Sequence, residues 1–120
     1  MTTSDDLQVR ARDHLPLTNA VFHILLCLAD GPSHGYAILQ EVESRSDGAV
    51  RMGTGTLYSA VKRLRESGVI AEHTEPSDDP RRRAYALTPL GREVVRAEAE
   101  RLAGLVRIAR AKAVLGGIGE

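Results

Sequence analysis

The chain has 120 residues, 42% of them hydrophobic and 27% charged, and its 16 Lys and Arg residues balance its 16 Asp and Glu residues. This composition indicates one folded domain and excludes a polycation. No apolar run reaches the roughly 18 residues that span a bilayer, no secretory signal segment is evident, and the single Cys27 excludes an internal disulfide. We therefore expect a cytoplasmic chain without a cofactor.

The N-terminal third predicts one well-buried helix behind a polar segment. Residues 1–14 are polar and carry charges of both signs, which predicts either a mobile tail or a short helix. Apolar residues then recur with helical spacing across residues 17–28, and either Thr18 or Asn19 suits the N-cap of this helix.

Two further helices are expected before residue 70. The first should begin after an N-cap at Ser33 and end near Gly48, which suits a left-handed position after a helix. The second should begin at Thr54 as its N-cap and end at Gly68. Its apolar residues lie within about 100° of one another on a helix, so we expect this face to be buried. These residues are Leu57, Ala60, Val61 and Leu64.

A hairpin and a long helix complete the chain. Residues 69–76 and 82–88 have the composition of strands and flank a polar turn. Thr88 before Pro89 is an N-cap followed by proline at the first helical position, and this helix should run to about Leu115. The fold class is therefore mainly α with a small β-hairpin: a winged helix–turn–helix plus a C-terminal dimerisation helix. We expect an N-terminal tail or short helix at 1–14, the winged helix–turn–helix at 15–88 and the dimerisation helix at 89–116.

The outward face of the third helix is polar, as a helix that enters the major groove of DNA requires. No Asp or Glu occurs between Arg51 and Arg65, and three consecutive arginines follow the hairpin turn, so several phosphate contacts are available. Such a run alone usually marks a solvated face; the helix–turn–helix order favours duplex DNA. Tyr58 is expected to give its hydroxyl to a phosphate. The predicted DNA-binding residues are Thr54, Gly55, Thr56, Tyr58, Ser59, Lys62, Arg63, Arg81, Arg82 and Arg83.

Several short motifs occur in unbroken order across residues 15–95. They are His34-Gly35-Tyr36, Gly55-Thr56-Leu57-Tyr58, Lys62-Arg63-Leu64, Gly68-Val69-Ile70, Arg81-Arg82-Arg83-Ala84-Tyr85 and Leu87-Thr88-Pro89-Leu90-Gly91. Together they resemble the PadR family of bacterial transcription regulators, in the subfamily that ends in a single dimerisation helix. The resemblance implies a homodimer that represses promoters and is often released by a small-molecule effector at the dimer interface. Because the chain contains no tryptophan, the stacking of planar drugs between tryptophans seen in multidrug-binding relatives is not expected.

The resemblance also assigns roles to single residues around the second helix. It implies that Gly35 allows close packing and that Tyr36 anchors this helix beneath the third. A structural role is favoured for His34 over a ligand role. Tyr85 is expected to anchor its strand to the core, because it shares a strand face with Leu87.

The last helix carries small and apolar residues at alternating steps of four and three, the seam of a coiled coil. Leu105 and Ile108 widen the apolar stripe, which must be covered by another surface. A partner subunit is favoured, and the alternative is a helix folded back on its own domain. Outside the apolar stripe, the surface of this helix is expected to be polar and to carry charged residues such as Glu98. The predicted dimer-interface residues are Val95, Ala99, Leu102, Leu105, Val106, Ala109 and Ala113.

Other chemistry has weaker support. His23 and Cys27 lie four residues apart on a helix, a spacing found among metal ligands, but no third ligand lies nearby. A buried thiol beside a core histidine is therefore favoured, and no metal is expected. Neither a phosphate-binding glycine loop nor a nucleophile motif is present, so we do not expect an enzyme. A winged helix that docks another protein remains the alternative to DNA binding.

Overall fold

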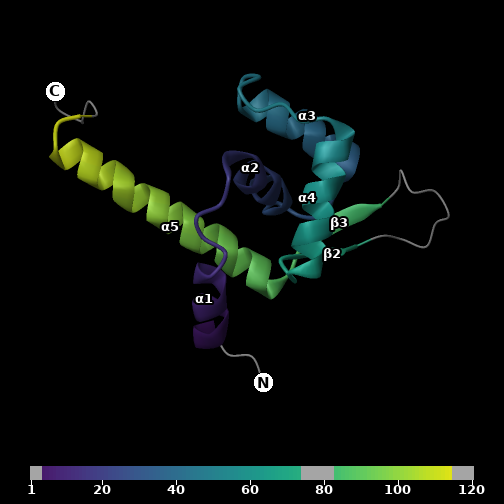
Figure 1. The fold of residues 1–120 in the computed structure, drawn as a ribbon, viewed down its shortest axis with the longest axis horizontal. Coiled ribbons are helices and arrows are strands. Elements are labelled where there is room, and N and C mark those ends of the chain that lie inside the picture. The colour runs from purple at the N-terminus through teal and green to yellow at the C-terminus, as the bar shows by residue number, and fades with distance from the viewer. Residues whose placement is uncertain (1–3, 74–82, 115–120) are drawn as a thin grey trace.

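The computed structural model describes residues 4–73 and 83–114, and Figure 1 shows the arrangement of its elements. The order of three core helices, a β-hairpin and a long last helix is that of a winged helix–turn–helix, which confirms the predicted fold class. An N-terminal helix and a short first strand complete the described part. The elements are α1 (Ser4–Arg12), α2 (Asn19–Leu28), β1 (Ser33–His34), α3 (Gly35–Arg45), α4 (Thr54–Glu66), β2 (Ile70–Glu72), β3 (Ala84–Leu87) and α5 (Pro89–Ala111).

The first helices begin and end largely where local side chains direct them. Thr18 is the N-cap of α2, and its hydroxyl oxygen accepts a hydrogen bond from the backbone N–H of Val21 at 3.1 Å. Gly48 has a φ of +79° after the end of α3, the left-handed conformation expected of it. The expected N-cap at Ser33 is wrong, because its backbone pairs with Tyr85 in the sheet and His34 occupies the cap position.

The sheet has three antiparallel strands in the order β1–β3–β2. Strand β3 is central: Tyr85 lies opposite Ser33 on one side and Glu72 on the other. Strand β1 was not expected, since two residues carry no periodicity of their own. The described parts of the two hairpin strands, Ile70–Glu72 and Ala84–Leu87, are shorter than predicted. Of the other predicted strand residues, 69, 73, 83 and 88 are described but lie outside the strands, and 74–76 and 82 lie outside the described residues.

Helices α4 and α5 each differ from the prediction at one end. Gly53, not Thr54, is the N-cap of α4, and its carbonyl accepts the backbone N–H of Leu57. Thr88 is the N-cap of α5, as predicted, and accepts the N–H of Gly91 at 3.0 Å. The predicted end of α5 near residue 115 is wrong, because the helix ends at Ala111 and Ala113 has a φ of +59°.

The core lies where α2, α3, α4, the sheet and the first turns of α5 meet. Ile24, Ile38, Leu57 and Val94 are among its fully buried side chains. Helix α1 packs against α5, and Ala11 of α1 is buried there. In Figure 1 the second half of α5 extends away from the other elements, so it is not folded back on its own domain. None of the described helices is long and apolar enough to cross a membrane.

Glu98 is a buried carboxylate rather than part of the polar face of α5. Its side chain is 1% exposed and accepts a hydrogen bond from the backbone N–H of Leu17 at 2.7 Å. Arg101, one turn later, donates to both carboxylate oxygens. The expectation that Glu98 faces solvent is therefore wrong, because this residue connects the α1–α2 linker to α5.

Candidate nucleic-acid interface

Helix α4 presents a polar face to solvent and an apolar face to the core. All four of its apolar residues that were predicted to be buried are buried. Its predicted contact residues are all exposed; they are Thr54, Gly55, Thr56, Tyr58, Ser59, Lys62 and Arg63. This face offers hydroxyl groups, an ammonium and a guanidinium to a partner, and these groups can donate hydrogen bonds to base edges and to phosphates.

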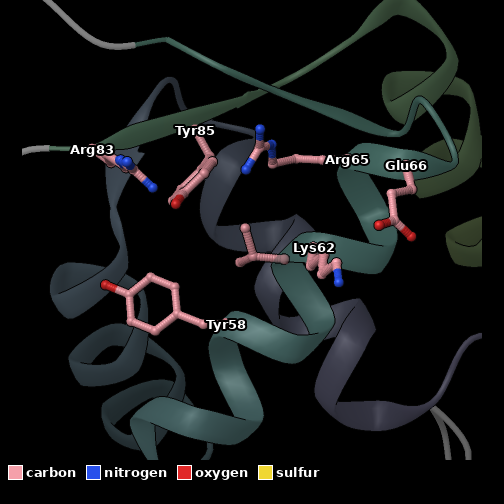
Figure 2. A pocket seen from close by; sticks show the side chains of 7 residues that line it. Tyr58, Lys62, Arg65, Glu66, Arg83 and Tyr85 are labelled. Atoms are coloured by element: carbon pink, nitrogen blue, oxygen red, sulfur yellow. The ribbon is translucent and has the colours of Figure 1, made fainter. Parts of the chain in front are cut away.

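Tyr58 connects α4 with the start of α3. A Cβ atom added at Gly35 would lie 2.6 Å from the Tyr58 hydroxyl, so the close packing expected at Gly35 is confirmed. In Figure 2 this hydroxyl points away from Lys62. Tyr36 is 68% exposed, so the expectation that it anchors α3 beneath α4 is wrong. Its ring instead lines an open hollow of about 510 Å³ with Leu39, Thr54 and Tyr58.

Two of the arginines that were considered for phosphate contacts, Arg83 and Arg51, form ion pairs with carboxylates. Arg83, just before β3, is exposed, and its Nε lies 3.5 Å from a carboxylate oxygen of Glu72 on β2. Arg51, which precedes α4, also has an acidic partner: its Nε lies 3.0 Å from a carboxylate oxygen of Glu43, although no Asp or Glu occurs between residues 51 and 65. Exposed ion pairs of this kind contribute little to stability, so a phosphate can compete for either guanidinium. The other two predicted arginines, Arg81 and Arg82, lie outside the described residues.

A cleft of about 490 Å³ opens between α4 and β3 (Figure 2). Three cationic side chains, two tyrosines, one valine and one glutamate line it. They are Lys62, Arg65, Arg83, Tyr58, Tyr85, Val61 and Glu66. This cationic cleft thus lies between the exposed polar face of α4 and the hairpin strand β3.

Tyr85 is the buried wall of this cleft. It is 2% exposed, which confirms its expected role as an anchor between strand and core. Burial raises the pKa of its hydroxyl above the ordinary value, and the neighbouring Tyr58 and Glu72 raise it further. Arg65 and Arg83 act in the opposite direction. At neutral pH the hydroxyl therefore stays protonated and can donate a hydrogen bond.

Arg65 also lines this cleft; the sequence places it among the cations available for phosphate contacts, although it is not one of the predicted DNA-binding residues. Tyr58, Lys62 and Arg65 are spaced i, i+4 and i+7, so they form one stripe along α4. In Figure 2 the Arg65 guanidinium lies toward Tyr85, across the cleft from Arg83. The helical spacing in the sequence is enough to place Arg65 on the same stripe of α4 as Lys62. It does not predict that the hairpin lies opposite this stripe.

The predicted dimer-interface residues divide into covered and uncovered ones. Val95 packs against the core of its own domain. Leu105 and Val106 are 50% and 39% exposed, and the neighbouring Ile108 is 57% exposed. Ala99 is exposed, whereas Leu102 and Ala109 are half-buried. Ala113 lies beyond the end of the helix, so it does not continue the predicted seam.

The pair His23 and Cys27 does not form a metal site in the described residues. No group of three His, Cys, Asp or Glu side chains there is arranged to hold a metal ion. Cys27 is buried, and burial together with Glu41 raises the pKa of its thiol to about 12. The thiol is therefore neutral, whereas a metal ligand or nucleophile needs the thiolate.

Comparison with known sequences gives one family. Residues 24–97 match the model of the transcriptional regulator PadR-like family. Over 89 residues the chain is 42% identical to a 37.1 kDa protein in transposon TN4556 of Streptomyces fradiae. That match covers 73% of this chain and 24% of the Streptomyces protein, so the chain spans about a quarter of this relative.

Solved structures of regulators share the fold. A transcriptional regulator from Clostridium thermocellum is similar with a TM-score of 0.65 and 25% identity, over 92% of this chain and 97% of that one. Bacillus subtilis PadR, solved in complex with operator DNA, has a TM-score of 0.56 and 22% identity. This second similarity covers 64% of this chain and 44% of the Bacillus chain, and it concerns the fold alone.

Proposed function

Because the chain belongs to the PadR-like family of transcriptional regulators, we propose that it binds double-stranded DNA as a homodimer and represses transcription from palindromic sites. The observation that carries this proposal is the outward face of α4, where Ser59, Lys62 and Arg63 are exposed beside the cationic hairpin. The members of the family are regulators rather than enzymes, and we assign no reaction to this chain.

In this proposal α4 enters the major groove. Gly55 and Ser59 lie close to base edges there, and Lys62 donates to a base acceptor such as the guanine O6 and N7 pair. The hairpin arginines 81–83 hold phosphates or reach the adjacent minor groove. Contacts to bases give sequence preference, whereas contacts to phosphates fix the orientation of the domain.

The dimer places two α4 helices on one face of the duplex. A palindrome requires them about one duplex turn apart, roughly 34 Å. The exposed apolar residues on the second half of α5 supply the surface for a partner. A small-molecule effector bound between paired α5 helices would change their angle, and thereby the distance between the two α4 helices. This is how we propose that repression responds to a ligand.

The experiment begins with selection of bound duplexes from a random pool, followed by affinity measurements on the selected site and on mixed-sequence DNA. Lys62→Ala should weaken binding to the selected site by about 1–3 kcal/mol and change binding to mixed-sequence DNA much less. Arg82→Ala, the matched control for phosphate contact, should weaken binding to all sequences similarly and reduce the salt dependence. If both variants bind the selected site as the wild type does, α4 and the hairpin are not the DNA-binding surface.

One observation supports docking of another protein as a second candidate function. The hollow lined by Tyr36, Leu39 and Tyr58 exposes aromatic and aliphatic surface beside the α4 face. The salt dependence of binding affinity distinguishes DNA binding from docking of a protein. Binding to DNA weakens steeply with salt because phosphate contacts release counterions, whereas docking at an apolar hollow is far less sensitive.

A further inference from the structure

The cleft between α4 and β3 combines features that the proposed recognition of bases leaves unused. Its volume of about 490 Å³ is larger than a single phosphate needs and can accommodate the adjoining sugar as well. Its walls come from two different elements, since Tyr58, Lys62 and Arg65 lie on α4 whereas Arg83 and Tyr85 lie on the β3 side. Figure 2 shows the guanidinium groups of Arg65 and Arg83 on opposite sides of Tyr85.

The charge inside the cleft favours an anion. Three cations line it against one carboxylate, that of Glu66. Arg83 forms an ion pair with Glu72, in which 3.5 Å separate its Nε from a carboxylate oxygen, and both side chains are exposed. Among the residues that the structure describes, Lys62 and Arg65 have no carboxylate within ion-pair distance. A cationic hollow of this kind gains free energy when a phosphate replaces water and counterions in it.

The proposed docking of α4 in the major groove brings the cleft close to the duplex backbone. With α4 in the major groove and the hairpin at the flanking minor groove, the strand between the two grooves runs over the junction of α4 and β3. Arg65 lies one turn beyond Lys62 on the same stripe of α4, and its guanidinium turns toward the hairpin. It is therefore placed for the backbone between the grooves, not for a base edge.

We propose that this cleft binds a backbone phosphodiester of the duplex, with Arg65 as its principal ligand and Arg83 as a flanking cation; the proposal rests on the proposed DNA binding. A guanidinium can donate two parallel hydrogen bonds to a phosphate, which fixes orientation as well as charge. The Tyr85 hydroxyl, which is protonated at neutral pH, is available as a further donor at the inner wall. Arg65 is thus a positioning residue that sets how deeply α4 enters the groove.

The test measures the salt dependence of affinity for a fluorescein-labelled duplex of mixed sequence by fluorescence anisotropy. Arg65→Gln should raise the dissociation constant several-fold at low salt and reduce the slope of log K against log salt by about 0.9 per lost phosphate contact. Arg65→Lys should keep most of the slope, because the charge remains. Arg10→Gln on α1, which removes the same charge outside the cleft, should leave both quantities unchanged.

A second variant acts in the opposite direction. Glu66→Gln removes the single carboxylate that lines the cleft, so it should tighten binding to the mixed-sequence duplex. Both residues are exposed on α4, and unfolding curves should show that each variant is folded. An unchanged slope for Arg65→Gln, or an unchanged affinity for Glu66→Gln, would overturn the proposal.

A third measurement separates the duplex backbone from a free phosphorylated molecule. The Nε–H resonance of Arg65 should shift when duplex is added and should not shift with millimolar deoxyadenosine monophosphate or inorganic phosphate. Saturable binding of the mononucleotide, with duplex affinity insensitive to Arg65→Gln, would make the cleft a small-molecule site and overturn the assignment to the backbone. Failure of the wild-type chain to bind any duplex would instead reject the proposed function, and this inference with it.

Discussion

Gly91 lies in the first turn of α5 at a point where two backbone segments meet. A Cβ atom added there would lie 2.0 Å from the carbonyl oxygen of Val69 and 3.2 Å from the Leu87 side chain. The backbone of Val69 cannot move freely, because its carbonyl also accepts the backbone N–H of Thr88 at 3.1 Å and its side chain is buried. The close approach of α5 to the start of the hairpin therefore depends on glycine at this position.

Gly91→Ala should lower the free energy of unfolding by about 2–3 kcal/mol, the cost of overpacking against a fixed neighbour. The matched control is Gly104→Ala on the same helix, where an added Cβ meets only the Arg107 side chain at 3.6 Å. That control should raise stability by about 0.5–1 kcal/mol, because alanine has the higher helix propensity. Urea unfolding followed by circular dichroism measures both, and equal effects of the two substitutions would contradict this account of Gly91.

Residue exposure on α4 could be predicted from the sequence, whereas single contacts between elements could not. The spacing of Leu57 and its apolar neighbours defines one face of a helix, and the structure buries this face. The exposure of Tyr36 and the position of the Tyr58 hydroxyl depend on how α3 and α4 cross at Gly35. This crossing is set by packing across the core, and no local pattern in the sequence encodes it.

At the scale of elements, Glu98 connects two segments that are far apart in the sequence. Its carboxylate holds the backbone N–H of Leu17, just before α2, against the middle of α5. The hydrogen bonds from Arg101 and from Leu17 lower the pKa of Glu98, although burial opposes this shift. Because the folded pKa lies below the ordinary value, Glu98 stabilises the folded state at neutral pH, and this contribution is lost as the pH falls through the folded pKa.

Glu98→Ala should therefore destabilise the fold by about 1–3 kcal/mol, since it leaves the Leu17 N–H without an acceptor. Glu98→Gln can still accept this bond but loses the charge, so its effect should be smaller. Free energies of unfolding measured from neutral pH to well below the ordinary glutamate pKa of about 4.3 test both variants. The difference between wild type and Glu98→Gln should shrink toward acidic pH; a difference that stays constant would assign the effect to packing.

The elements themselves were predicted to different degrees. Local signals located α2 and the start of α5, because Thr18 and Thr88 cap these helices with their own side chains. Strand β1 could not be predicted, since Ser33 and His34 form a strand only by pairing with the distant β3. The buried Glu98 was missed for the same reason, because its partner at Leu17 lies outside its own helix.

At the scale of the whole molecule, α5 has two halves with different surroundings. Its first half packs against α1 and the core, where Val94 is fully buried. Its second half extends away from the other elements and leaves Leu105, Val106 and Ile108 exposed on a helix that ends at Ala111 (Figure 1). An uncovered apolar surface on a projecting helix is a common mark of an interface, and a second copy of α5 is the partner that the proposed homodimer supplies.

Val106→Glu places a charge in the centre of this apolar surface. If two copies of α5 pack there, the carboxylate is buried without a partner and the dimer should weaken by about 3 kcal/mol or more. Sedimentation velocity at micromolar concentration should then show a monomer, and affinity for a palindromic site should fall together with dimer formation. Arg107→Glu introduces the same side chain at the next position, on the charged side of the helix, and should leave the dimer intact. A dimer that persists in Val106→Glu would move the interface to another surface, and the distance between the two α4 helices would then be set by contacts other than the exposed half of α5.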